Sequence, residues 1–197
     1  MTRTKLLIAC AVAVLMPSLA NFAYAQTDSA KERFTFVAAN GSKAGPSGEG
    51  RLELVVTRWS SDAERDRVRS VVTEGPDKLL NAFHDSYMTG WIHWPGNLDY
   101  TLRYARRTLR PDGGEDLVLV TDAPIWLGWE PALSTRGTEA PFTVIQLRLN
   151  KEGTGEGKVY LGTKIRSDKD AGIVLEDDAS QPTLLTDIRR ERSATAN

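Results

Sequence analysis

The chain has 197 residues, with 26 acidic and 25 basic side chains and a formal net charge of −1. A surface of balanced charge argues against nucleic acid or anionic membrane as the main partner, because both attract strongly basic proteins. Cys10 is the only cysteine, which excludes an intramolecular disulfide. A folded domain must therefore be stabilised by its hydrophobic core.

The first residues have the pattern of a secretory signal peptide. A basic start precedes an apolar run over 6–19, and residues 23–25 form a small-x-small cleavage site. The pattern predicts removal of residues 1–25, a mature start at Gln26 and a periplasmic or secreted location. The apolar run is shorter than the roughly 20 residues that a membrane helix needs, so no membrane insertion is expected after cleavage.

Two strands are predicted near the mature N-terminus. Residues 33–38 and 51–59 alternate between apolar and polar side chains, which is typical of a strand with one buried face. In the second segment Leu52, Leu54 and Val56 share the apolar face.

A helical hairpin is expected over about 61–86. Ser61 and Glu64 form a capping box, and Pro76 is suited to the first turn of a second helix. The buried sides of the two helices are predicted from apolar residues at helical spacing, namely Val68, Val71, Val72, Leu79, Leu80 and Phe83.

Short strand patterns separated by turns follow the tryptophan-rich segment 90–95. They cover 98–104, 116–121, 124–129, 142–149, 159–165, 173–175 and 183–190. Residues 111–114 predict a hairpin turn, and residues 151–157 a long flexible turn. About nine strands with one inserted helical hairpin indicate a predominantly β, α+β fold, either an antiparallel barrel or a sandwich. We expect one domain over 26–192 and a disordered tail over 193–197.

Aromatic side chains are the candidate ligand-binding residues. Flat rings with an N–H or O–H group suit stacking on sugars or the lining of an apolar pocket, although the same residues are common in ordinary sheet packing. The candidates are Trp91, His93, Trp126, Trp129, Tyr100 and Tyr104. Alternation places Tyr100, Leu102 and Tyr104 on one face of a strand.

The candidates for catalytic chemistry are one histidine and three carboxylates. His93 is a possible general acid or base, but no serine or mature cysteine stands in a nucleophile motif. Asp99, Asp122 and Glu130 are the carboxylates that could serve glycoside hydrolysis. The two histidines lack metal-ligand spacing, and no phosphate-binding loop is present. Neither a metal nor a cofactor is expected.

A basic run covers Arg103, Arg106, Arg107 and Arg110. Alternation places Arg103 and Arg107 on the same face of a strand. The balanced charge of the chain favours a solvated strand face over an anion site.

Several segments together resemble a group of small secreted bacterial proteins with no assigned activity. The segments are Arg58-Trp59, Asp62-Ala63-Glu64-Arg65-Asp66, Leu102-Arg103-Tyr104-Ala105, Phe142 to Leu149 and Gly155-Glu156-Gly157-Lys158. The resemblance implies one exported domain and brings no catalytic motif.

Three functions remain open on the sequence. The first is a non-catalytic exported domain that binds a small apolar or aromatic-stacking ligand, or a partner protein of the cell envelope. The alternative is a hydrolase acting on a polysaccharide or an ester. A purely structural role would be indicated by a filled barrel without a cavity.

Overall fold

The computed structural model describes residues 31–39, 51–93, 99–123, 125, 142–163, 165–168, 172–175 and 182–192. Eight strands of this part form a closed antiparallel barrel. They are β1 (Glu32–Ala39), β2 (Leu52–Val56), β3 (Gly90–His93), β4 (Tyr100–Leu109), β5 (Glu115–Thr121), β6 (Phe142–Leu149), β7 (Thr154–Thr163) and β10 (Thr183–Arg192). The predicted predominantly β, antiparallel fold is confirmed, and of the two predicted architectures it is the barrel and not the sandwich.

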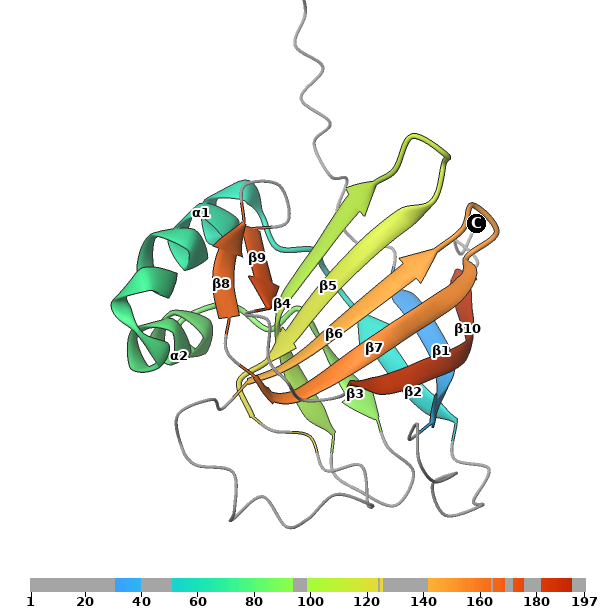
Figure 1. Ribbon diagram of the computed structural model, residues 1–197, viewed down its shortest axis with the longest axis horizontal. Helices are drawn as coiled ribbons and strands as arrows, with labels where there is room; N and C mark the ends of the chain where they lie inside the picture. Colours follow the sequence, from blue (N-terminus) through green and yellow to red (C-terminus); the bar gives the residue numbers. More distant parts are fainter. Residues whose placement is uncertain are drawn as a thin grey trace, which may run out of the picture.

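The barrel has a simple up-and-down order (Figure 1). Strands β1 to β7 are neighbours in chain order, and β10 closes the barrel between β7 and β1. Two more strands, β8 (Ile165–Asp168) and β9 (Gly172–Leu175), form a separate hairpin. Closure pairs the backbone groups of every barrel strand on both sides, which removes exposed sheet edges.

The predicted helical hairpin is confirmed between β2 and β3. It consists of α1 (Asp62–Val71), the 3-10 turn η1 (Val72–Glu74) and α2 (Pro76–His84). The Ser61 hydroxyl accepts from the Glu64 amide at 3.2 Å, and the Glu64 carboxylate accepts from the Ser61 amide at 2.8 Å. Neither helix of the described chain has the length and apolar character needed to cross a bilayer.

The helices lie beside the β8–β9 hairpin on one flank of the barrel (Figure 1). Their apolar sides pack on outward-facing residues of β4, β5 and β6. The centre of this contact is Phe83, whose ring centroid lies 5.5 Å from that of Phe142 and 6.3 Å from that of Tyr104. A second core therefore holds the helices on the outside of the barrel.

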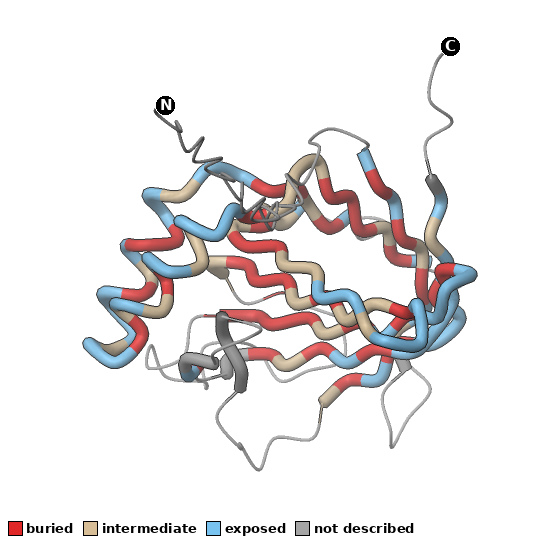
Figure 2. The backbone as a smooth tube through the Cα atoms, turned by 90° about the horizontal axis from the view of Figure 1, so that it is seen from above, coloured by how far each residue is buried: buried red, intermediate tan, exposed pale blue. Residues whose placement is uncertain are grey.

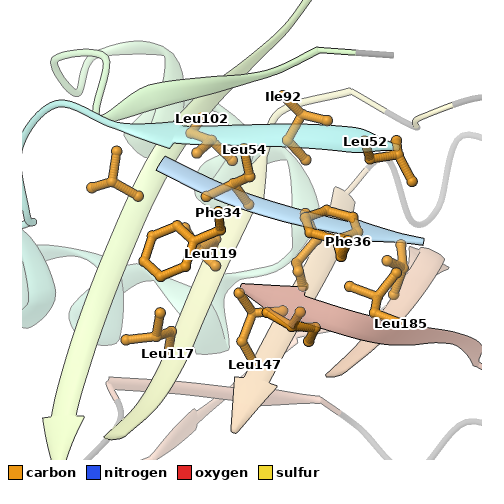
Figure 3. Close-up of a cluster of buried hydrophobic side chains, with 14 of the residues drawn as sticks. Phe34, Phe36, Leu52, Leu54, Ile92, Leu102, Leu117, Leu119, Leu147 and Leu185 are labelled. Atoms are coloured by element: carbon orange, nitrogen blue, oxygen red, sulfur yellow. The ribbon is translucent and has the colours of Figure 1, made fainter. Parts of the chain in front are cut away.

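Apolar side chains fill most of the barrel interior. Buried and less buried residues alternate along the strands (Figure 2), as expected when one face points inward. The inward residues are Phe34, Phe36, Leu52, Leu54, Val56, Ile92, Leu102, Ala105, Leu117, Leu119, Ile145, Leu147, Leu149, Val159, Leu161, Leu185 and Ile188, with Ile125 packed against them. Several of them are shown in Figure 3, where Phe36 lies beside Leu52 and Leu185.

A bulge in β4 makes one sequence prediction wrong. The pairing of β4 with β5 shifts register between Leu102 and Tyr104, so these two residues face opposite sides of the sheet. Leu102 lies in the barrel interior, and Tyr104 packs beneath the helices. For the same reason Arg103 and Arg107 do not share a face, because a bulge adds one residue to one strand of a pair.

The long turn predicted over 151–157 is also wrong. The turn ends at Gly153, and β7 begins at Thr154. Gly155 and Gly157 face the interior opposite Leu149 and Leu147. Gly157 leaves room for the side chains of Leu147 and Ile188, and at Gly155 the backbone of Arg148 comes too close for a Cβ.

Replacing Gly157 with Ala is expected to lower the free energy of unfolding by about 1–3 kcal/mol through overpacking. An added Cβ would lie 2.7 Å from Leu147 Cδ2 and 2.8 Å from the Gln146 carbonyl oxygen. Urea denaturation measures the loss. Glu156→Ala, on the exposed side of the same strand, is the control and should change stability by less than about 0.5 kcal/mol. Equal stability of the two variants would contradict the packing argument.

Candidate functional site

The two ends of the barrel interior differ in chemistry. At one end lie the start of β1 and the short turns that join β4 to β5 and β6 to β7. Four charged residues point inward there, and we call this the charged end. The connection from β2 to β3, which contains the helices, also leaves from this side. The other four connections join strand ends at the opposite end of the barrel, where the interior side chains are apolar. We call this the apolar end.

A ring of alternating charges fills the charged end. Glu32 and Glu115 each contact both Arg107 and Arg190. Arg190 Nε lies 3.3 Å from Glu32 Oε2, and Arg107 Nε lies 3.4 Å from Glu115 Oε2. The exposed fractions are 5% for Arg190, 12% for Glu32 and 13% for Glu115. Their charges balance, which is the condition for burying ionised groups.

Aromatic side chains complete the charged end. The Arg107 guanidinium lies 4.2 Å from the centroid of the Trp59 ring, and Trp59 Nε1 donates to Glu32 Oε1 at 3.3 Å. Arg190 lies 5.3 Å from the Phe34 ring centroid. These contacts combine charge pairing with cation–π attraction. Both guanidinium groups therefore contact carboxylates and aromatic rings of the protein itself.

The charged ring was missed because Arg107 was interpreted as part of a solvated face. A signal for it does exist in the sequence. Glu32 continues the alternation of Phe34 and Phe36, and Glu115 continues that of Leu117 and Leu119. Strict alternation therefore places both carboxylates inside, where only basic partners could balance them.

The apolar end contains a small cavity. Its walls are hydrocarbon side chains from six strands and from Ile125, and Phe36 lies among them. The lining residues are Phe36, Leu52, Ile92, Ile125, Ile145, Val159 and Leu185. The volume is about 10 Å³, roughly the space of a single water. Tyr100 is partly buried against the same core.

Strand direction gathers four connections at the apolar end. Residues 40–51, 94–99, 122–141 and 164–182 each join strand ends there. Loops at a barrel mouth are a common place for binding residues. Three tryptophans belong to these connections by sequence, namely Trp94, Trp126 and Trp129. The candidates Trp126, Trp129 and Glu130 lie outside the described residues.

Trp91 and His93 lie on the outer face of β3, because Ile92 between them points inward. Lys31 Nζ is 5.0 Å from the centroid of the Trp91 ring. His93 Nδ1 lies 2.7 Å from Asp99 Oδ1, and both side chains are about half exposed. A carboxylate in this position orients a histidine ring, so the pair forms a histidine–aspartate dyad at the outer rim of the apolar end.

Asp122 does not take part in the histidine–aspartate dyad and contacts other residues. Its Oδ2 accepts from Arg103 Nε at 2.8 Å and lies 3.2 Å from His84 Nε2. His84 ends α2, so Asp122 ties the helix to the barrel. In the described ranges no three histidine, cysteine, aspartate or glutamate side chains gather as a metal site.

Tyr104 lies on the outer face of β4 beneath the helices and is 1% exposed. Burial raises the pKa of its phenol to about 12, from an ordinary value of 10.0. The neutral phenol is the form that fits this apolar setting.

Stability is expected to fall at alkaline pH through Tyr104. Because the folded-state pKa is raised, its contribution is complete below pH 10 and is lost as pH rises toward 12, at up to about 1.4 kcal/mol per pH unit. Urea denaturation between pH 9 and 12 measures this slope. Tyr104→Phe should flatten it, whereas Tyr87→Phe, at a side chain 82% exposed, should not. An unchanged slope in Tyr104→Phe would contradict the assignment.

Comparison with known proteins gives no relative of this chain. No protein-family model matches it, and neither a curated protein nor a solved structure matches it. The resemblance to small secreted bacterial proteins stays a prediction.

Proposed function

We propose that this protein is an exported, non-catalytic binding domain that takes a small apolar ligand at the apolar end of the barrel. The observation that carries the proposal is that the two ends of the barrel interior differ in chemistry. One end is filled by a ring of charges that neutralise one another, and the other end has a cavity lined only by hydrocarbon side chains.

The cavity is large enough to form only the floor of a binding site and is too small to be a deep pocket. A volume of about 10 Å³ holds no drug-sized ligand, since such sites measure roughly 300–1,000 Å³. Only the tip of a ligand fits among the lining side chains, and its remainder stays outside the cavity. The aromatic candidates Trp126 and Trp129 belong by sequence to one of these connections, which fits a stacking role for them.

A pair of phenylalanines allows a controlled test. Phe36 and Phe34 lie two residues apart on β1, face the interior and are 1% and 0% exposed. Phe36 lines the cavity, whereas Phe34 lies deeper, under Arg190. Phe36→Leu and Phe34→Leu therefore remove similar volume, but only Phe36→Leu widens the floor of the site.

We expect benzene and 1-octanol to shift the methyl NMR signals of Leu52, Ile92 and Leu185 in the unaltered protein. Phe36→Leu should bind these probes several-fold more tightly, because added space at the floor accommodates more of the ligand. Phe34→Leu should bind them as the unaltered protein does. Signals that do not move in any of the three proteins would overturn the proposal.

The histidine–aspartate dyad supports a second candidate, a hydrolase acting on an ester or a polysaccharide. The 2.7 Å contact between His93 and Asp99 is the observation in its favour. A screen of ester and polysaccharide substrates tests it. Turnover that falls at least about 100-fold in His93→Ala, as loss of a general base predicts, would establish it; turnover that is absent or unaffected would dismiss it.

A further inference from the structure

The charged groups inside the barrel lie at the opposite end of the interior from the cavity. Inward residues of a middle layer separate the cavity from the charged ring, and in Figure 3 Phe34, Leu117 and Leu119 lie on the opposite side of the view from Leu52 and Leu185. Arg107 and Arg190 already face Glu32 and Glu115. A ligand tip that enters from the apolar end therefore meets hydrocarbon and no countercharge.

Two arginines near the rim of the apolar end contact carboxylates. Arg51 contacts Asp187, and Arg103 contacts Asp122. Arg51 also donates to the Asp187 carbonyl, and Arg189 holds the other carboxylate oxygen of Asp187. Recruiting one of these cations to a ligand would separate an existing pair.

From this we infer that the site selects an amphiphile by its uncharged apolar end, a short acyl chain or an aromatic ring, and is indifferent to the charge of its head group. The inference rests on the proposed function. An inserted ion would lose its hydration without a partner, which is strongly unfavourable. The charged or polar head therefore stays outside, and affinity follows the apolar surface that is buried.

The same geometry limits the length of the inserted chain. Each added methylene should tighten binding by about fourfold while it finds apolar surface, from about 0.8 kcal/mol per CH₂. The gain should stop once the tip fills the cavity, because a volume of about 10 Å³ admits only the end of a chain. A plateau within a series of straight-chain alcohols would mark this depth.

Isothermal titration with three matched probes tests the inference. At pH 7 and below their micellar concentrations, 1-octanol, nonanoate and octylammonium carry the same octyl chain on neutral, negative and positive heads. We expect dissociation constants within about threefold of one another, with little change between low and high salt, because screening affects only charge interactions. A charged probe that binds at least tenfold more tightly than octanol, with an affinity that falls in salt, would overturn the inference.

Variants of the rim provide the control. Arg51→Gln and Arg103→Gln remove the charges of two paired cations whose side chains are 41% and 27% exposed. Both variants should bind nonanoate and octanol as the unaltered protein does. A selective loss of nonanoate binding would show that a rim cation holds the head group, which leaves the proposed function intact. Failure of all three probes to bind would instead remove the proposed function together with the inference.

Discussion

Arg190→Met is expected to lower the free energy of unfolding by about 3–5 kcal/mol, as is typical when one partner of a buried ion pair is removed. Arg190 is 5% exposed and contacts both Glu32 and Glu115. Without it, two buried carboxylates share the single guanidinium of Arg107. Urea denaturation of the purified protein measures the loss.

The double variant Arg190→Met/Glu115→Gln provides the sharper comparison. It removes one charge of each sign and leaves the Glu32–Arg107 pair in place. We expect it to be more stable than the sum of the two single losses predicts, by about 0.5–3 kcal/mol, the range for residues in direct contact. Simple additivity of the two substitutions would contradict a coupled ring.

An exposed ion pair is the control for the charged ring. Arg33 Nε lies 3.2 Å from Glu53 Oε1 on the outside of the barrel, with exposed fractions of 44% and 29%. Arg33→Met should cost no more than about 1 kcal/mol, because water screens the pair and already solvates both groups. A loss as large as that of Arg190→Met would show that burial is not what distinguishes the ring.

Phe83→Ala is the second substitution with a large expected effect, a loss of about 3–5 kcal/mol from a buried aromatic side chain. Phe83 is 0% exposed and packs on Tyr104 and Phe142. The loss should appear in one cooperative urea transition that the far-ultraviolet signal of the helices and the tryptophan fluorescence of the barrel report together.

Leu80→Ala is the matched control on the same helix. Leu80 is only partly buried at the edge of the same cluster, so about 1 kcal/mol is expected. Two separate transitions in Phe83→Ala, with the barrel as stable as before, would show that the helical hairpin is an accessory and not part of the same cooperative unit.

Local patterns predicted most of the secondary structure. The capping box at Ser61 and Pro76 at the second helix placed the helical hairpin, since both depend on groups within one turn of the chain. Leu52, Leu54 and Val56 were correctly assigned to one face, because strand alternation is a local geometric property. The hairpin turn at 111–114 was equally local.

The sequence predictions are wrong where pairing with a neighbouring strand determines which way a residue faces or where a strand begins. The bulge between Leu102 and Tyr104 depends on the pairing of β4 with β5, and it alone sends Tyr104 outward and Arg107 inward. Gly155 and Gly157 have a typical turn composition, yet they belong to a strand because Leu149 and Leu147 lie opposite them. Pairing across the sheet overrides such local preferences.

The sequence by itself determined a mostly β chain with one helical hairpin and aromatic segments after residue 90. Only the tertiary structure decided that the sheet closes, that the interior has a charged and an apolar end, and which aromatic residues lie near either end. Alternation along a strand predicts which residues share a face of that strand. It does not predict which faces of strands distant in the sequence come together, and the barrel interior is formed by those faces.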